Sequence, residues 1–232
     1  MSYEGAIGPG KVIIYAAYEP TLFSTKYRVV FGKLQQIFTR QKWTHTALGF
    51  FHFVGYLKTE TLFESNEIQN VTLWEPNIDA EYEIYNIKYY TQTQIKAALW
   101  KTFYEFNGEL YGFTQILYFV RRWFWETKWI KKLFWWIPTR VFGKPNDIRL
   151  WNNWFVGGTI CSELFYDLMS NLNELKYNAG VDKMLRTWNK NNFHSGDSRV
   201  FMLELPEIFE KEYHKAGGII DKEFYDYIRK SI

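Results

Sequence analysis

The segment that decides the fold of this 232-residue chain reads Gly157-Gly158-Thr159-Ile160-Cys161-Ser162-Glu163-Leu164-Phe165. It holds the single cysteine of the sequence, placed shortly after a Gly-Gly break. From Leu164 onward, apolar residues recur at three- and four-residue spacing, which predicts a helix with one buried face. Thr159 suits the N-cap of that helix, because its hydroxyl can accept a bond from a main-chain N–H one turn later. The pattern therefore places Cys161 in the first turn.

A cysteine at this position has a chemical interpretation and a plain one. The unpaired N–H groups and the dipole at a helix start favour negative charge, and the thiolate is the nucleophilic form of cysteine. A lone cysteine on a helix is, however, commonly a small buried apolar residue. A nucleophilic Cys161 requires a base and an orienting group that come from other parts of the chain.

The best base candidate lies on a predicted strand at residues 43–51. His45, Ala47 and Gly49 share one face of that strand by the period-two rule, and the small residues leave room for another element to approach closely. The following predicted strand, 61–64, ends in Glu64, a carboxylate that could orient the His45 imidazole.

His52 shares the predicted strand with His45 but points to its other face. The remaining two histidines have plainer interpretations. His194 lies in a polar turn, where a structural role is expected. His214 is expected on a charged helical face in contact with solvent. Neither is predicted to serve as the base.

The other elements follow from periodicity and from turn and capping signals. Strands are predicted at 10–15, 71–74, 82–89 and 201–205, the middle ones forming an antiparallel meander with 43–51 and 61–64. Helices are predicted to begin near Ser24, Thr91 or Thr93, Val181, Pro206 and Asp221, and the second of these is predicted to end at Asn107-Gly108. The sequence thus predicts an α+β domain in which an antiparallel sheet packs against the Cys161 helix.

An aromatic and basic segment, 114–156, precedes that helix and holds seven of the eleven Trp residues. Between 121 and 149, eight Lys or Arg residues stand against two acidic residues. On a helical projection Trp125, Trp129 and Trp136 fall opposite an apolar stripe, on a side that a soluble helix normally keeps polar. These three side chains are predicted to bind a partner.

We expect that partner to contact residues 114–150. A second protein ranks first, because apolar residues dominate the segment and Trp and Arg anchor protein interfaces. A membrane surface ranks second. Nucleic acid ranks last, because the net charge of the whole chain is only +3.

Composition bounds the remaining classes. One cysteine excludes an intrachain disulfide, and without a second cysteine or closely spaced histidines it does not suit a structural zinc site, so no metal or other cofactor is expected. The first 20 residues lack the features of a signal peptide, and no apolar run is long enough to form a transmembrane helix. We therefore expect a cytoplasmic or virion-associated protein.

The order His45, Glu64, Cys161 reverses that of papain-like enzymes, in which the cysteine helix comes first. In this order the chain resembles the circularly permuted papain-like hydrolases, a group with permuted relatives of NlpC-type cell-wall peptidases and enzymes like lecithin retinol acyltransferase. The matching motifs are Gly10-Lys11-Val12-Ile13-Ile14, Thr44-His45-Thr46-Ala47, Leu62-Phe63-Glu64, Gly108-Glu109-Leu110-Tyr111-Gly112 and Ile160-Cys161-Ser162-Glu163-Leu164. Two features depart from the group: Lys11 stands where members often have an acidic residue, and the 114–156 insertion is longer and more aromatic.

The resemblance implies a single catalytic domain over 1–232, with 114–156 inserted in it. It implies that Cys161 attacks a carbonyl, His45 shuttles the proton and Glu64 holds the imidazole. Tyr111 resembles a tyrosine that assists the transition state in NlpC-type enzymes; core packing beside Gly112 is the alternative.

Three function classes follow from this resemblance. The leading expectation is a thiol hydrolase that cleaves an amide bond in a peptide or a cell-wall stem peptide. A lipid acyl hydrolase or acyltransferase is the first alternative, because the insertion could address a membrane. A non-catalytic structural or virion protein that keeps the fold is the second.

Overall fold

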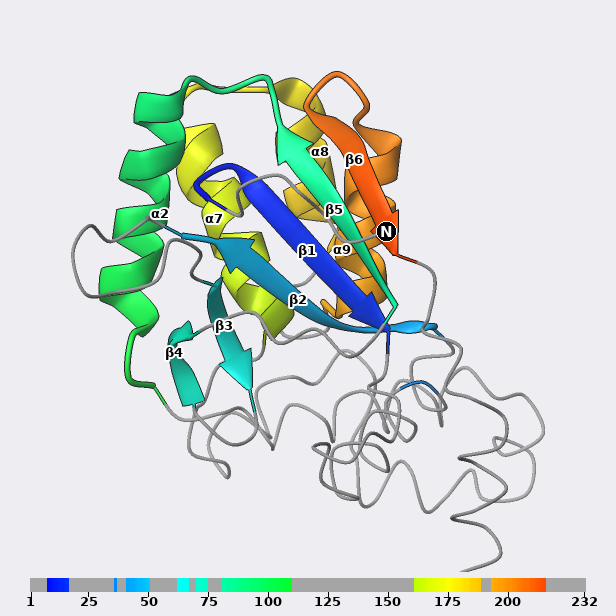
Figure 1. Ribbon diagram of the computed structural model, residues 1–232. Coiled ribbons are helices and arrows are strands. Elements are labelled where there is room, and N and C mark those ends of the chain that lie inside the picture. Colours follow the sequence, from blue (N-terminus) through cyan, green and yellow to red (C-terminus); the bar gives the residue numbers. More distant parts are fainter. Residues whose placement is uncertain are drawn as a thin grey trace, which may run out of the picture.

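The computed structural model describes residues 8–16, 36, 41–50, 62–66, 70–74, 81–109, 161–188 and 193–215, with the main chain alone for 62–66, 70–74 and residue 215. Within these ranges the chain forms a six-stranded sheet and four helices (Figure 1). The predicted α+β class with an antiparallel sheet is confirmed. The predicted helices near Ser24 and Asp221, the N-cap at Thr159 and the 114–156 segment lie outside the described residues.

The sheet has the strand order β4-β3-β2-β1-β5-β6, and every neighbouring pair is antiparallel. Its strands are β1 Lys11–Ala16, β2 Trp43–Gly49, β3 Leu62–Asn66, β4 Asn70–Trp74, β5 Tyr82–Ile87 and β6 Phe209–Lys215. The predicted meander is correct from β2 to β4 and wrong for β5, which pairs with β1 instead of β4. The physical reason lies in β1, whose apolar residues are buried along its length and suit the centre of a sheet.

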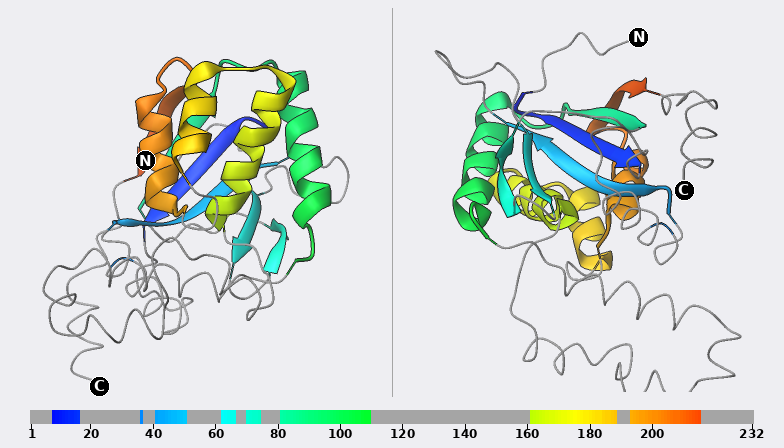
Figure 2. Two further views of the ribbon diagram at one scale, coloured as in Figure 1. Left: turned by 180° about the vertical axis from the view of Figure 1, so that it is seen from behind. Right: turned by 60° about the horizontal axis from the view of Figure 1, so that its bottom comes forward.

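The four described helices lie on one face of this sheet (Figure 2). They are α2 Gln92–Phe106, α7 Cys161–Leu175, α8 Ala179–Thr187 and α9 Ser195–Glu204. Thr91 caps α2 through a reciprocal pair of bonds with Gln94, and Gly108 follows the helix with φ of 86°. Both ends of α2 therefore agree with the sequence prediction.

The apolar face of α7 forms the middle of the core. Its buried apolar side chains are Leu164, Phe165, Leu168, Met169 and Leu172, and they belong to one cluster with Val12, Ile14 and Leu48 of the sheet. Burying a side chain of this size stabilises a fold by roughly 1.5 to 3 kcal/mol. The predicted helix with one buried face is confirmed.

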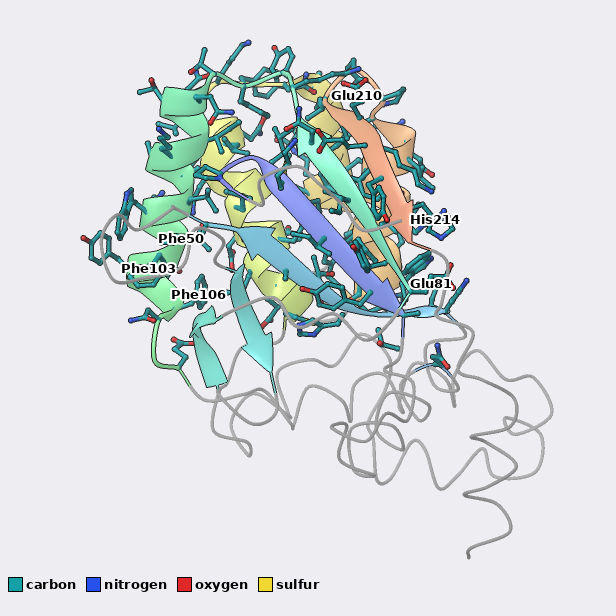
Figure 3. The ribbon with its side chains drawn as sticks, viewed as in Figure 1. Phe50, Glu81, Phe103, Phe106, Glu210 and His214 are labelled. Atoms are coloured by element: carbon teal, nitrogen blue, oxygen red, sulfur yellow. The ribbon has the colours of Figure 1, made fainter. Side chains whose placement is uncertain are left out.

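Helix α2 packs along the outer side of α7 and over the end of β2. Asn171 of α7 donates a hydrogen bond to the Thr102 hydroxyl of α2 over 3.0 Å, and both side chains are buried. Phe50, which follows β2, packs on Phe103 with ring centroids 5.0 Å apart (Figure 3). These contacts fix α7 between α2 and the sheet.

The predicted strand at 201–205 is wrong, since these residues continue helix α9. Ser198, Phe201, Met202 and Leu205 are buried at the three- and four-residue spacing of a helix. The expected polar turn is the helix start: the His194 ring accepts from the Asp197 N–H, and the Asp197 carboxylate accepts from the His194 N–H. His194 thus has a structural, capping role.

The predicted helix after Pro206 is also wrong, because the chain turns into strand β6. His214 lies in this strand, not on a helical face, and its Nε2 is 2.9 Å from Oε1 of Glu81 (Figure 3). The main-chain ladder to β5 supplies the pairing for a segment rich in charged residues. Charged side chains are common on strands at the edge of a sheet.

Gly49 shows why a small residue ends β2. A Cβ atom at this position would lie 2.3 Å from the carbonyl oxygen of Gly8. The element that approaches the small residues of β2 is therefore the turn that leads into β1. Only glycine fits this contact without a shift of the main chain.

Candidate active site

Cys161 lies in the first turn of α7, as the sequence predicts. Only 4% of its surface is exposed. The next residue anchors this helix start: the Ser162 hydroxyl donates to the Phe193 carbonyl oxygen over 2.6 Å. Phe193 immediately precedes the His194 cap of α9. The starts of α7 and α9 are thus held together.

His45 lies in β2, next to an irregularity in the strand. Tyr15 pairs with His45 and Ala16 pairs with Trp43, so Thr44 is an extra residue that forms a bulge. The carbonyl oxygen of Thr44 is 4.0 Å from Sγ of Cys161. The His45 ring stacks on the Tyr15 ring, with centroids 5.2 Å apart and planes inclined by 20°. The bulge brings the main chain of β2 against the cysteine, and the stacking fixes the imidazole.

The His45 imidazole lies close enough to Cys161 to affect its thiol. Burial raises the pKa of the Cys161 thiol, but the charge and hydrogen bond of His45 lower it, as do the Ser195 hydroxyl and the main chain of Thr46. The net pKa of the thiol is below its ordinary value. The structure therefore brings together the predicted nucleophile and the predicted base.

Ser195 completes the immediate surroundings of the sulfur atom. It is the first residue of α9, and its Oγ lies 3.6 Å from Sγ of Cys161. Ser195 is not among the predicted site residues, because the sequence of its segment predicts a polar turn. The buried helical spacing from Ser198 onward is the signal that would have placed Ser195 at a helix start.

Glu64 lies in β3, next to the strand of His45. Phe63 pairs with Leu48, so the main chain at Glu64 is level with Ala47, two residues from His45. The Glu64 side chain lies outside the described residues. Tyr111, Trp125, Trp129 and Trp136 lie outside them as well.

A second polar cluster lies between β5, β6 and α9. Glu83, which is 2% exposed, accepts hydrogen bonds from Arg199 Nε over 2.6 Å, from Lys211 Nζ over 2.5 Å and from Tyr85 Oη over 2.7 Å. Burial raises the pKa of Glu83, but these three bonds outweigh it and lower the pKa to about 2. The carboxylate is therefore ionised at neutral pH and ties α9 to the sheet.

Two further tests concern metals and membranes. In the part of the chain that the structure describes, no group of three or more His, Cys, Asp or Glu residues could hold a metal ion. The helices built from those residues include none with both the length and the apolar character to cross a bilayer.

Comparison with known proteins gives no relative. No protein-family model, no curated protein and no solved structure matches this chain.

Proposed function

We propose that this chain is a thiol-dependent hydrolase that cleaves an amide bond, with Cys161 as nucleophile and His45 as base. The observation that supports this most directly is the buried Cys161 thiol at the start of α7, whose pKa the neighbouring His45 lowers. A plain core cysteine in apolar surroundings would have a raised pKa. The combination of helix start, imidazole and lowered pKa is typical of a reactive thiol.

In the acylation step, the thiol proton moves to His45 and the sulfur attacks the substrate carbonyl carbon. The main-chain N–H of Cys161, at the start of α7, is placed to stabilise the negative oxygen of the tetrahedral intermediate. His45 then gives its proton to the leaving amine, and the C–N bond breaks. A thioester between Cys161 and the acyl group remains.

In the deacylation step, His45 takes a proton from water, and the resulting hydroxide attacks the thioester. The C–S bond breaks, the carboxylic acid leaves, and the proton on His45 returns to the sulfur atom. Each proton taken by His45 is thus returned within the cycle. The Tyr15 ring stacks on the His45 imidazole and so holds the imidazole in one orientation through both steps.

Glu64 is proposed as the group that orients His45, in a permuted papain-like arrangement. The position of β3 beside β2 and the order His45, Glu64, Cys161 along the chain support this role. The same resemblance makes a peptide or a cell-wall stem peptide the proposed substrate class. Digestion of peptidoglycan and of peptides, compared with acyl release from lipid vesicles, separates this class from a lipid acyl substrate.

The deciding experiment replaces Cys161 by Ser. Because the chain has one cysteine, an electrophilic thiol probe reports on this residue alone. We expect Cys161→Ser to fold, to lose labelling completely and to lose hydrolysis by at least about a thousandfold. Ser170→Ala, on the same helix and partly exposed, is the matched control and should keep both. Hydrolysis at full rate by Cys161→Ser would refute the proposal.

The partner surface at 114–150 is a separate proposal that rests on sequence alone. Trp125, Trp129 and Trp136 alternate with basic residues, which suits a second protein copy or, next, an anionic membrane surface. Replacement of all three by Ser should change sedimentation in the first case and liposome flotation in the second. Unchanged behaviour in both assays would leave no partner role for these rings.

A further inference from the structure

The first residues of two helices meet at the candidate nucleophile. Cys161 begins α7, Ser195 begins α9, and the Sγ to Oγ distance is 3.6 Å. Both residues are buried, with 4% and 2% of their surface exposed. At this distance the hydroxyl is within hydrogen-bond reach of the large sulfur atom.

The direction of this bond depends on the state of the sulfur atom. A neutral thiol can donate its proton to the serine oxygen, whereas a thiolate can only accept. The serine hydroxyl can rotate to serve either state. A bond to a charged acceptor is roughly twice as strong as one between neutral groups, so the contact favours the ionised sulfur.

Three contacts hold Ser195 in place beside the sulfur atom. The capping pair of His194 and Asp197 fixes the first turn of α9. Four residues after Ser195, Arg199 binds the buried Glu83 of β5. Between them, Ser198 Oγ accepts from the Thr46 hydroxyl of β2 over 3.4 Å. Helix α9 is therefore attached to the same strand that carries His45.

The titratable and polar groups around the sulfur atom come from three elements. Strand β2 contributes His45 and the main chain of Thr44 and Thr46. Helix α9 contributes Ser195, while the titratable groups nearest to it, His194 of the N-cap and Asp197 of the first turn, are paired with each other. On α7 itself, Glu163 is buried two residues further along. Among these groups, Ser195 is a hydroxyl donor to the sulfur atom that does not itself titrate near neutral pH.

We propose that Ser195 is a positioning residue of this site: its hydroxyl donates to the ionised sulfur of Cys161 and holds it beside His45. The inference rests on the proposed role of Cys161 as nucleophile. Ser195 acts through Cys161 and takes no part in proton transfer to the substrate. It makes α9 the third element of the site, after α7 and β2.

The test is a pH titration of thiolate absorbance in the ultraviolet, with Cys161→Ala as the blank. The chain's single cysteine makes the signal specific, and the measurement needs no reagent to enter the buried site. In Ser195→Ala we expect the titration midpoint to rise and the thiolate fraction below it to fall by about tenfold. Ser195→Thr, which restores the hydroxyl, should restore the midpoint.

Ser170→Ala is the matched control, because it also removes a hydroxyl from a helix, but Ser170 is partly exposed and lies nine residues after Cys161 on α7. Its midpoint should equal that of the unaltered chain. An unchanged midpoint in Ser195→Ala, or equal shifts in both variants, would overturn the proposal. The titration reports on this contact whether or not the chain hydrolyses any substrate, so its failure is distinct from the failure of the proposed function.

Discussion

Two buried polar clusters lie along helix α9 and differ in what their charges can do. At its start, Ser195 and His45 surround the sulfur atom of Cys161. One turn later, Arg199 and two further groups surround the carboxylate of Glu83. The Glu83 pKa of about 2 means that its charge stays fixed over the whole range near neutrality. The charge on Cys161 depends instead on the neighbouring His45 imidazole and the Ser195 hydroxyl.

The difference separates a structural cluster from the one that we propose to be reactive. Two cations and a hydroxyl more than offset the negative charge of Glu83, so this carboxylate keeps its charge without exchanging a proton. The cluster therefore serves to hold β5, β6 and α9 together. Cys161 faces one imidazole, and the pair can exchange a single proton. The structural cluster also holds the helix that brings Ser195 to the sulfur atom. Substitutions in the two clusters should therefore have opposite signatures.

The largest expected effect is a loss of chemistry without a loss of stability. His45→Ala should lower hydrolysis by about a thousandfold or more, nearly as much as loss of Cys161, because the two residues act as a unit. It should also raise the titration midpoint of the Cys161 thiol, since His45 lowers the pKa of that thiol. Steady-state kinetics and the thiolate titration measure the two effects.

His214→Ala is the matched control for this variant. His214 lies on β6 and pairs with Glu81 at the surface, so neither activity nor the thiol midpoint should change. Glu64→Gln should reduce activity less than His45→Ala, because an orienting group can be partly replaced. Retention of the wild-type midpoint in His45→Ala would remove the distinction between the two clusters.

The second expected effect is the reverse: the free energy of unfolding falls, and the pKa of the Cys161 thiol does not change. The difference between about 4.5 and about 2 in the pKa of Glu83 corresponds to roughly 3 kcal/mol at neutral pH. Arg199 and Lys211 are partly exposed and can be hydrated when the charge is lost, so we expect Glu83→Gln to cost about 2 kcal/mol. Denaturant unfolding measures this free energy.

Glu210→Gln provides the control for that experiment. Glu210 is an exposed residue of β6, paired through its main chain with Asn86 of β5 (Figure 3). Its replacement should change the free energy of unfolding by no more than about 0.5 kcal/mol. Equal effects of the two substitutions would mean that the buried cluster adds nothing beyond an ordinary surface charge.

The third effect is the pH dependence of the same cluster. Because the folded-state pKa of Glu83 is lowered, its stabilisation is complete above the unfolded value of about 4.5. The stabilisation is lost as pH falls from there towards about 2. The difference in unfolding free energy between the unaltered chain and Glu83→Gln should therefore shrink across this window. A constant difference down to the lower limit would show that charge is not its source.

The sequence predicted the parts of the fold that rest on strong local patterns. The apolar stripe of α7, the Thr91 cap of α2 and the apolar run of β1 each set one element, and all three are confirmed. The position of Cys161 at the helix start and that of His45 on its strand were also accessible, because they follow from a helix pattern and a strand face.

The predictions that were wrong concern elements whose partners are distant in the sequence. The place of β5 next to β1 is a matter of sheet topology, which no local pattern encodes. The charged segment Phe209–Lys215 becomes a strand only because β5 offers its edge and Glu83 offers a partner for Lys211. Ser195 was missed because the N-cap of α9 is a histidine instead of a common capping residue, so the sequence of this segment predicts a polar turn.

The smallest expected effect concerns what one hydroxyl group contributes to the structural cluster around Glu83. Tyr85 donates to Oε2 of Glu83 over 2.7 Å, and burial, together with this bond, raises the pKa of the phenol. Tyr85→Phe removes the hydroxyl and keeps the ring that packs in the core, so it should cost about 1 kcal/mol, the value of one buried hydrogen bond. It should also raise the pKa of Glu83 slightly, which carbon-detected NMR titration of the carboxyl group can measure. If the two cations alone determine the charge of Glu83, that pKa will not move, and the hydroxyl will contribute to packing and not to the electrostatics of the cluster.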